Sequence, residues 1–312
     1  MKRIDLVFPY VDSSKITWQQ AYSKATGKYY NNNEKQRFYA DGELLRYKLR
    51  ATEKFMPWIR NVYMLVHDKL QVPKWINQEN VIIVEHKDFI PNEVLPVFNS
   101  CAIEMFVHLI KGLSDYFIYS NDDVIPNGFL APDDFFYQDY DGSIKVKNKL
   151  QILSIKDYRE RKHSYFTIAR NSYQFANEIA TVRKNRSLGE FDYPQVPHVS
   201  TPMLRDFNMA IYESLTDEIL ESVTPLRDFK NFNQYLFAFS YMTNGLSQID
   251  SKYKHRYCAT TKTDLPMILK CLRNENYKEI VINDVEKTDF EVYPYIYKAY
   301  EQKLPNKCKY EK

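Results

Sequence analysis

Four short apolar segments near the start of the chain constrain its fold more than any other feature. Each is too short for a core helix, is rich in β-branched and aromatic residues, and lacks strict alternation of apolar and polar positions. These properties are typical of strands that are buried on both faces, as in a parallel sheet. The four segments are IDLVFPYVD (4–12), NVYMLVHD (61–68), NVIIVEHKD (80–88) and YFIYSNDD (116–123).

Helical patterns lie between these strands. GELLRYKLRATEKF (42–55) places its leucines along one side, and NSCAIEMFVHLIKGLS (99–114) repeats apolar residues at helical intervals. Asn99 or Ser100 is suited to cap the second of these helices. Because strands and helices alternate, the sequence predicts an α/β fold with a doubly wound, mostly parallel sheet.

Beyond residue 127 the pattern changes. Residues 128–195 predict an insertion with a hairpin that turns at Asp141-Gly142 and a helix at 166–184. Residues 196–312 predict an α-rich part with one late strand. Its expected elements are helices within 203–222 and 228–245, a strand at 278–284 and a final helix before KLPNKCKYEK (303–312).

The size of the chain allows a substantial core. It has 312 residues, of which 44% are hydrophobic. No linker rich in Gly, Ser or Pro divides it, so we expect a single unit over residues 1–312 that begins with the α/β part at 1–127.

Charge and hydropathy exclude several classes of protein. The net charge is only +3, and no basic block alternates with aromatic residues, which argues against a nucleic-acid partner. No apolar run approaches the roughly 18–20 residues needed to cross a bilayer, and the N-terminal segment lacks the pattern of a signal peptide. The cysteines are widely spaced, which fits a reducing compartment, and we expect a cytoplasmic protein. They are Cys101, Cys258, Cys271 and Cys308.

Each of the four predicted strands ends on a carboxylate. These residues are Asp12, Asp68, Asp88 and the pair Asp122/Asp123. Ligands of doubly wound sheets bind beyond the carboxyl ends of the strands. A single Asp there is ordinary turn chemistry. Four such strand ends on one edge predict a polar rim that suits a metal ion.

The strongest candidate on this rim is the carboxylate pair Asp122 and Asp123, with the Asn121 amide beside it. Mg²⁺ and Mn²⁺ prefer oxygen ligands and usually share their coordination with phosphates. A solvated turn is the alternative interpretation, and the triplet by itself does not exclude it.

Other polar residues are weaker candidates. His198 lies in PQVPHVSTP, outside any apolar periodicity, where either a functional or a structural histidine fits. The late strand ends on Asn283-Asp284, which repeats the amide and carboxylate of residues 121–122 and predicts a second wall of the same site.

Four arginines before or on predicted helices could clamp a diphosphate, because the guanidinium fork matches phosphate oxygens; a solvated helix face is the alternative. They are Arg37, Arg46, Arg50 and Arg227. No Walker loop, GxGxxG, GxSxG or HExxH motif occurs, which excludes P-loop, Rossmann dinucleotide, serine-hydrolase and zincin sites.

Taken together, these segments resemble the Stealth family of sugar-1-phosphate transferases, which includes bacterial capsular polysaccharide phosphotransferases and the catalytic subunit of the lysosomal-enzyme GlcNAc-1-phosphotransferase. IDLVFPYVDSS resembles the first family block, and the long second block runs from RFYADGELLRYKLRATEKFMPWIRNVYMLVHDKLQVPKWI to LSDYFIYSNDDVIPNGFLAPDDFF. PHVSTPMLRDFNMAIYESL and TPLRDFKNFNQYLFAFSYM are similar to the third block, and EIVINDVE and KLPNKCKYEK to the fourth. The resemblance implies a fold like that of nucleotide-sugar transferases.

The resemblance also implies roles for individual residues. Asp122 and Asp123 would bind Mg²⁺ or Mn²⁺, His198 would be the general base, and Arg227 would assist catalysis with Asp123. Asn283 would contact the substrate. The further substrate contacts that it implies are Asp12, Arg37, Arg50, Asn99, Ser100 and Asn121.

The reaction implied is transfer of a sugar 1-phosphate from a UDP-sugar to a hydroxyl of an oligosaccharide or lipid-linked saccharide, with release of UMP. The protein would work in the cytoplasm or at the inner face of the membrane, in peripheral contact with membrane-bound assembly machinery. A metal-dependent glycosyltransferase that releases UDP fits the carboxylate motif equally well. A non-catalytic carbohydrate-binding assembly protein is a third hypothesis.

Overall fold

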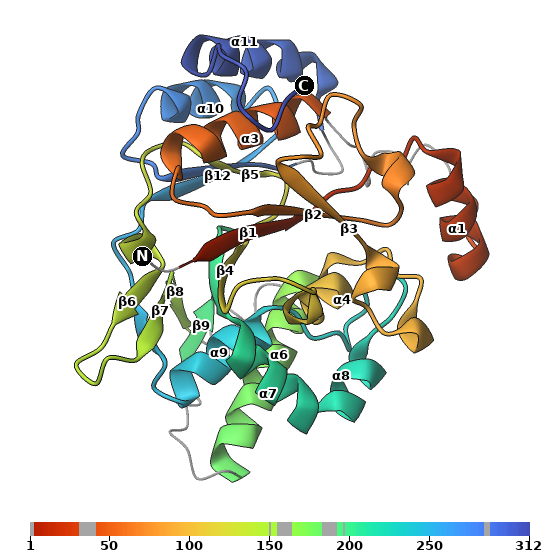
Figure 1. Ribbon diagram of the computed structural model, residues 1–312, viewed down its shortest axis with the longest axis vertical. Coiled ribbons are helices and arrows are strands. Elements are labelled where there is room, and N and C mark those ends of the chain that lie inside the picture. Colours follow the sequence, from red (N-terminus) through yellow and green to blue (C-terminus); the bar gives the residue numbers. More distant parts are fainter. Residues whose placement is uncertain are drawn as a thin grey trace.

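A five-stranded sheet with strand order β10-β4-β1-β2-β3 forms the centre of the computed structural model (Figure 1). The structure describes residues 3–30, 42–149, 151–154, 164–182, 192–195, 197–283 and 288–312. Four strands of the sheet run parallel and coincide with the four apolar segments of the sequence. They are β1 (Ile4–Pro9), β2 (Val62–Val66), β3 (Val81–Glu85) and β4 (Tyr116–Tyr119). The predicted α/β fold with a mostly parallel sheet is therefore confirmed.

Helices cover both faces of this sheet and bury its central strands on both sides. All five residues of β2, for example, are buried. In Figure 1 the sheet separates one group of helices above it from another group below it, while α1 (Ile16–Thr26) lies at the right-hand edge. Those above are α3 (Gly42–Phe55), α10 (Leu265–Leu272) and α11 (Tyr293–Lys303). Those below are α4 (Ser100–Glu104), α6 (Ser164–Val182), α7 (Arg205–Ser214), α8 (Thr216–Ser222) and α9 (Tyr235–Thr243). No helix in the described ranges is long and apolar enough to span a membrane.

The fifth strand, β10 (Thr201–Leu204), is antiparallel to β4 and was not predicted. The sequence analysis assigned residues 203–204 to the start of a helix, and this assignment was wrong. All four residues of β10 are buried, and the helix α7 begins only at Arg205, whose backbone N–H bonds to the carbonyl of Asp115. The pairing of β10 with β4 brings the loop that carries His198 beside the end of β4.

Three smaller sheets flank the central one. The first has the order β12-β13-β5 and joins the late part of the chain to the segment that follows Asp123. Its strands are β12 (His255–Ala259), β13 (Glu279–Asn283) and β5 (Val124–Pro126). The late strand predicted at 278–284 is thus confirmed as β13, while β12 was not predicted.

The predicted hairpin in the insertion is also confirmed. Its strands β6 (Phe136–Gln138) and β7 (Ile144–Asn148) are antiparallel, and Gly142 adopts the left-handed φ of 82° that the turn requires. The strand β11 (Ser247–Ile249) joins β7, and β8 (Gln151–Ser154) pairs with β9 (Asp192–Gln195).

The helix predicted over 99–114 is much shorter than expected. Asn99 caps α4 as anticipated, but α4 ends at Glu104 and only a 3-10 turn follows it, η4 (Val107–Leu109). Residues 101–108 are all buried, so the segment lies inside the protein on every side. A regular repeat of apolar residues therefore did not mark one face of a continuous helix. The other 3-10 turns are η1 (Lys69–Gln71), η2 (His86–Asp88), η3 (Asn92–Val94), η5 (Pro132–Asp134) and η6 (Phe290–Val292).

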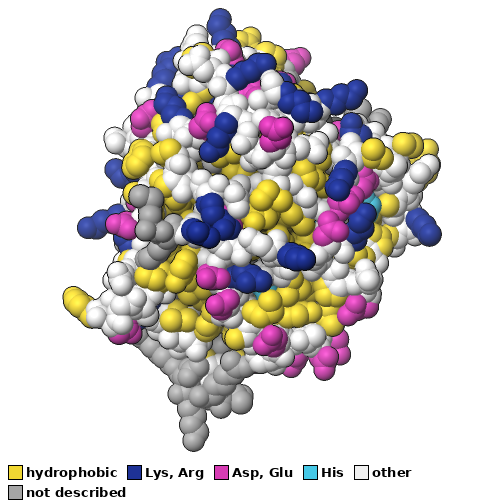
Figure 2. All heavy atoms as spheres, in the orientation of Figure 1, with side chains coloured by type: hydrophobic (Ala, Val, Ile, Leu, Met, Phe, Trp, Pro, Cys, Tyr) yellow, Lys and Arg dark blue, Asp and Glu magenta, His cyan; other side chains and the backbone are white. Residues whose placement is uncertain are grey.

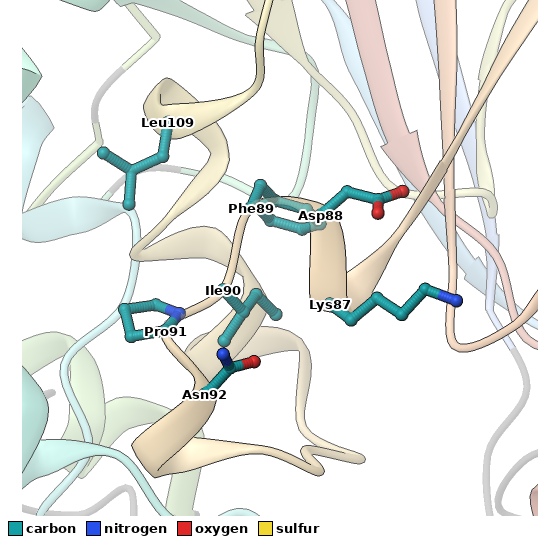
Figure 3. A pocket seen from close by; sticks show the side chains of 7 residues that line it. All are labelled: Lys87, Asp88, Phe89, Ile90, Pro91, Asn92 and Leu109. Carbon is teal, nitrogen blue, oxygen red and sulfur yellow. The ribbon is translucent and has the colours of Figure 1, made fainter.

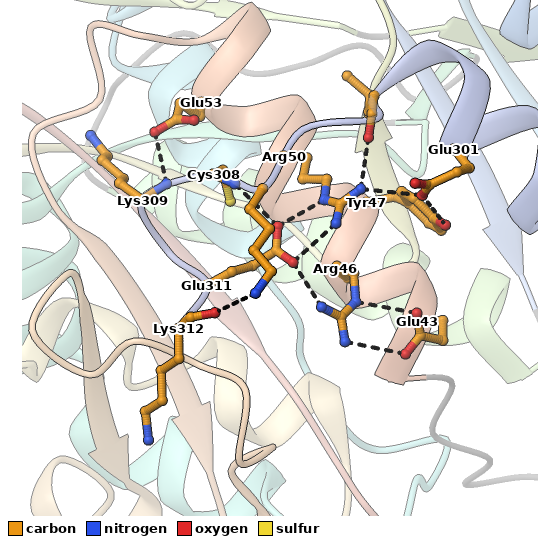
Figure 4. A network of polar contacts seen from close by, with 12 residues as sticks. Glu43, Arg46, Tyr47, Arg50, Glu53, Glu301, Cys308, Lys309, Glu311 and Lys312 are labelled. Carbon is orange, nitrogen blue, oxygen red and sulfur yellow. Dashed lines mark hydrogen bonds and ion pairs between the residues drawn. The ribbon is translucent and has the colours of Figure 1, made fainter.

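A buried ion-pair network attaches the C-terminal segment to α3 (Figure 4). The fully buried Glu311 carboxylate accepts hydrogen bonds from Arg50 Nε and from Arg46 Nη1, both at 2.7 Å. Burial alone would raise the pKa of Glu311, but the two arginines outweigh it and lower that pKa to about 2. Glu311 also forms an antiparallel β-bridge with Ile76, so the C-terminal segment is held at a second point of the chain.

We predict that Glu311→Gln lowers the free energy of unfolding at pH 7 by about 2–3 kcal/mol, since hydrogen bonds to charged groups contribute about 1.5–3 kcal/mol each. The pKa of Glu311 is lower in the folded state than its ordinary value of 4.5, so the stabilisation is complete above pH 4.5 and disappears as the pH falls towards 2. Denaturant unfolding of both proteins over this pH range measures the difference.

Glu301→Gln is the matched control, because Glu301 pairs with the same Arg50 at 3.3 Å but its side chain is 57% exposed. This variant should lose less than about 1 kcal/mol. Equal losses in the two variants would contradict the assignment of Glu311 as the buried anchor.

Candidate active site

The turn that carries Asn121, Asp122 and Asp123 connects two sheets. It leaves the carboxyl end of β4 in the central sheet and enters β5 in the second sheet, and the Val124 N–H closes it on the carbonyl of Asn121. Both strands are anchored in the core, so the short turn has little freedom to move. The sequence analysis predicted this position at a strand end, and the structure confirms it.

A buried lysine on α3 holds this turn from the inside. Lys48 Nζ donates hydrogen bonds to Ser120 Oγ at 2.9 Å and to the carbonyls of Asn121 and Val124 at 2.9 Å and 2.7 Å. Burial lowers the pKa of Lys48 to about 8, against the opposing effect of nearby carboxylates, Asp122 and Asp123 among them. The sequence analysis missed Lys48, because on an amphipathic helix it looks like one more exposed charge.

His198 lies directly against the carboxylate turn. Its Nε2 is 2.9 Å from Asp123 Oδ1 and 3.2 Å from Oδ2. The loop before β10 presents His198 there because Thr201 pairs with Tyr119 at the end of β4. Both side chains remain partly exposed, at 23% for His198 and 16% for Asp123, so a ligand has access to the pair.

Asn283 forms the second wall that the sequence analysis anticipated. Its Nδ2 donates to Asp123 Oδ2, and its Oδ1 accepts from the Tyr257 hydroxyl at 3.0 Å. The Tyr257 ring also meets the His198 ring edge-on, with centroids 6.3 Å apart. Tyr257 was not singled out in the sequence, because β12 itself was not predicted. Asp284 lies outside the described residues.

The charges of His198 and Asp123 stabilise each other. Burial would lower the pKa of His198, but the Asp123 carboxylate outweighs that effect and the pKa is raised. Burial would likewise raise the pKa of Asp123, but His198 and the hydrogen bond from Asn283 lower it. The amide nitrogen of Asn121 lies 3.2 Å from Nε2 of the same imidazole. Asn121, Asp123, His198 and Asn283 therefore form one connected polar cluster.

Arg227 and Ser100 lie together next to a buried carboxyl group. Arg227 Nη2 donates to Ser100 Oγ at 3.2 Å. Burial raises the pKa of Glu104, on the same short helix α4 as Ser100, to about 7, although the Gln234 N–H and the charges of Arg227 and His198 oppose this effect. Glu104 therefore lies in the electrostatic field of both Arg227 and His198. It was missed because a Glu in the first turn of a predicted helix is unremarkable in a sequence.

Arg50 and Asn99 have other partners than a substrate. All the hydrogen bonds found for Arg50 go to Glu301, Glu311 and the carbonyl of Leu304, so the expectation that it clamps a diphosphate needs correction: it anchors the C-terminal segment. Asn99 is buried, accepts from Cys101 N–H as the cap of α4 and donates to Asn231 Oδ1 at 2.7 Å. Asn99 therefore holds the start of α4, where the neighbouring Ser100 lies.

The other expected rim residues accept hydrogen bonds from neighbouring protein groups, including one from the Thr17 hydroxyl to Asp68 at 3.1 Å. Asp12 accepts from Ser14 and pairs with Lys15 at 3.2 Å, at the start of α1. Asp68 caps η1 by accepting from Leu70 N–H. Asp88 accepts from Glu85 N–H within the turn that, with residues 89–92 and Leu109, lines a surface hollow of about 340 Å³ (Figure 3). Asp12, Asp68 and Asp88 thus each have protein partners beside their strand ends, and Arg37 lies outside the described residues.

The carboxylate turn suits a divalent cation that shares its coordination with a ligand. Within the described parts of the chain, no group of three or more His, Cys, Asp or Glu side chains is arranged to enclose a metal ion. Mg²⁺ usually takes only one or two carboxylates together with substrate phosphates. Asp122 and Asp123 provide that pair, and Asn121 Oδ1 is a buried oxygen with no hydrogen-bond partner among the described residues. These oxygens fit Mg²⁺ or Mn²⁺.

The surface seen in Figure 2 carries mixed charges. Lys and Arg side chains are interspersed with Asp and Glu and with apolar patches, and no continuous basic track crosses the described part of this face.

Comparisons with known proteins match a conserved region and several relatives to this chain. Residues 37–144 match the model of Stealth protein CR2, conserved region 2, which contains the carboxylate turn. The capsular polysaccharide phosphotransferase cps12A of Actinobacillus pleuropneumoniae is 38% identical over 156 residues, which are 47% of this chain and 41% of that protein. The alignment thus spans less than half the length of that relative.

Other relatives align from end to end. The receptor polysaccharide phosphotransferase WefC of Streptococcus oralis is 29% identical, and the capsular polysaccharide phosphotransferase WcwK of Streptococcus pneumoniae is 26% identical; both alignments cover 100% of each chain. The solved galactosyltransferase LgtC, in complex with donor and acceptor sugar analogues, covers 98% of both chains at 10% identity and a TM-score of 0.44, and this distant likeness bears on neither activity nor ligands. The chain is thus similar to Stealth proteins in conserved region 2, at residues 37–144, and to polysaccharide phosphotransferases along its whole length.

Proposed function

We propose that the protein transfers a sugar 1-phosphate from a UDP-sugar to a hydroxyl of an acceptor saccharide, forming a phosphodiester and releasing UMP. The acceptor would be an oligosaccharide or a lipid-linked saccharide of a capsular or cell-surface polysaccharide. The names of the relatives support phosphate transfer in such a synthesis. The single observation that carries the proposal is the contact of His198 with Asp123 on the carboxylate turn.

His198 is the general base in this proposal. Its Nε2 faces the Asp123 carboxylate, so we assign the ring proton to Nε2. Nδ1, which lies 3.5 Å from the Asn121 amide nitrogen, is then the nitrogen that accepts the proton of the attacking hydroxyl. Asp123 fixes this orientation and stabilises the imidazolium that forms, as the carboxylate does in Ser-His-Asp sites. Asn283 in turn holds Asp123, so the imidazole is oriented by two successive side chains.

The negative charge of the donor needs cations close to the phosphates. Arg227 next to Ser100 is suited to bind the oxygens of the transferred phosphoryl group, because its guanidinium fork matches their geometry. Asp122 and Asp123 would hold Mg²⁺ or Mn²⁺, which would neutralise the diphosphate and stabilise the leaving UMP. The protein would work in the cytoplasm or at the inner face of the membrane, in peripheral contact with assembly machinery.

The first prediction from this proposed function concerns the base. His198→Ala and His198→Gln should both lower kcat by about 10²–10⁴-fold, the usual contribution of a general base, with a smaller effect on donor KM. Gln keeps an amide for Asp123 but cannot take a proton, so it serves as the matched variant. Both proteins should unfold at nearly the wild-type temperature. Activity of His198→Gln within tenfold of wild type would remove His198 from the chemistry.

The second prediction concerns the metal ion. EDTA should abolish turnover, and Mg²⁺ or Mn²⁺ should restore it. Asp122→Ala should be inactive yet folded, because a side chain at the rim contributes little to core packing. Asp88→Ala is the control, since Asp88 also follows a parallel strand but only closes its own turn. Full activity in chelator would contradict a metal-dependent mechanism.

The third prediction distinguishes phosphoryl transfer from glycosyl transfer. If the hydroxyl attacks phosphorus, the anomeric bond survives, the product gains one phosphorus per sugar and UMP accumulates in equal amount. A glycosyltransferase would give UDP and a product without phosphorus. The ³¹P spectrum of the purified product and the nucleotide released from a panel of UDP-sugars measure the two outcomes. Stoichiometric UDP would refute the proposed reaction.

A further inference from the structure

Lys48 is an unusual residue for the position it occupies. It is 1% exposed, it lies on α3, and all three hydrogen bonds found for its ammonium group go to the residues that form the carboxylate turn. An ammonium group has three donors, so these bonds use its full capacity. Burying a charge costs free energy unless it is hydrogen-bonded and compensated, and three well-formed bonds at this site meet the first condition.

Glu279 on β13 is a buried carboxylate whose charge acts on Lys48 and also on the buried Lys149. The Glu279 side chain is fully buried, and among the carboxylates whose charge acts on Lys48 it has the largest influence, ahead of Asp122 and Asp123. Glu279 Oε2 also accepts a hydrogen bond from the backbone N–H of Ser200 at 3.2 Å. Ser200 is two residues beyond His198, in the loop that leads into β10.

The two members of this pair therefore hold opposite sides of the same site. Lys48 fixes the backbone of the turn that carries Asp122 and Asp123, while Glu279 fixes the loop that carries His198. We infer that Lys48 and Glu279 form a buried positioning pair that sets the distance between His198 and Asp123 and hence the geometry of the reacting groups. The expected effect on kcat rests on the proposed function, whereas the expected coupling of the two residues in stability rests on geometry alone.

The chain offers a matched control for Lys48. Lys303 on α11 also donates three hydrogen bonds, to the carbonyl and Oδ1 of Asn127 at 2.7 Å and 2.8 Å and to the carbonyl of Leu272 at 2.9 Å. Burial lowers its pKa to about 8, as it does for Lys48. Lys303 thus supports the other end of β5, past Pro126, away from the carboxylate turn. A methionine at either position keeps the length of the side chain and removes the charge and the three bonds.

The experiment compares Lys48→Met with Lys303→Met in thermal unfolding and in turnover, scored as UDP-sugar consumed. Both should lower Tm by several degrees. Only Lys48→Met should lower kcat, by about 10- to 100-fold, because a displacement near 1 Å in reacting groups costs about that much. Its donor KM should change by less than about threefold. Lys303→Met should keep kcat within about threefold of wild type, and equal kcat values in the two folded variants would overturn the inference.

Two further variants keep the test decisive. If Lys48→Met does not fold, Ser120→Ala removes one acceptor of Lys48 without removing its charge, and kcat should fall several-fold; an unchanged kcat would count against the inference.

The double variant Lys48→Met/Glu279→Gln buries no uncompensated Lys48 charge. Its loss in Tm should be smaller than the sum of the two single losses, and additive losses would refute the pair.

These outcomes are separable from those of the proposed function. Release of UDP instead of UMP would refute phosphoryl transfer but leave the comparison of kcat values intact. If the wild-type protein consumes no UDP-sugar at all, the proposed function fails, and the Tm values of the four proteins in the cycle still decide whether Lys48 and Glu279 are coupled.

Discussion

The site depends on two antiparallel strand pairings that meet at one turn. β10 pairs with β4, and β13 pairs with β5, while β4 and β5 are separated only by residues 120–123. Because of these pairings, His198 and Asn283 both reach Asp123, although they are 75 and 160 positions away in the chain. Without either pairing, Asp122 and Asp123 would be an ordinary solvated turn, which was the alternative interpretation of their sequence.

This dependence explains how much of the site could be predicted from the sequence. The four parallel strands were correctly identified, because burial on both faces requires continuous apolar runs that no exposed segment would tolerate. β10 was missed because four residues that include a proline do not form a recognisable pattern, and its strand character comes from pairing with β4. The family resemblance implied roles for His198 and Asp123, but their contact could not be derived from local pattern, since long-range pairing has no local signature.

The residues that the sequence analysis assigned elsewhere or overlooked show the same limit. Arg50 and Lys48 lie on one helix two positions apart, and both look like exposed charges on an amphipathic segment. In the structure Arg50 binds the buried Glu311, whereas Lys48 binds the carboxylate turn. Helical periodicity predicts which side of a helix is apolar, but it does not predict where a long basic side chain ends. That choice is decided by the nearest acceptors, which belong to distant parts of the chain.

The arrangement of charges gives a physical reason for the proposed metal ion. Asp122 and Asp123 would repel a diphosphate at close range, and the buried Lys48 ammonium acts on both of them from the protein side of the turn. Its three donors are already used by the turn, so Lys48 has none left for a substrate phosphate. His198 contacts Asp123 and must be neutral to accept a proton, so it adds no positive charge for the phosphates. Arg227 is then the side-chain cation that the proposal assigns to them. A divalent cation held by Asp122 and Asp123 would supply the missing positive charge between protein and donor, which Lys48 on the inner side of the turn does not supply.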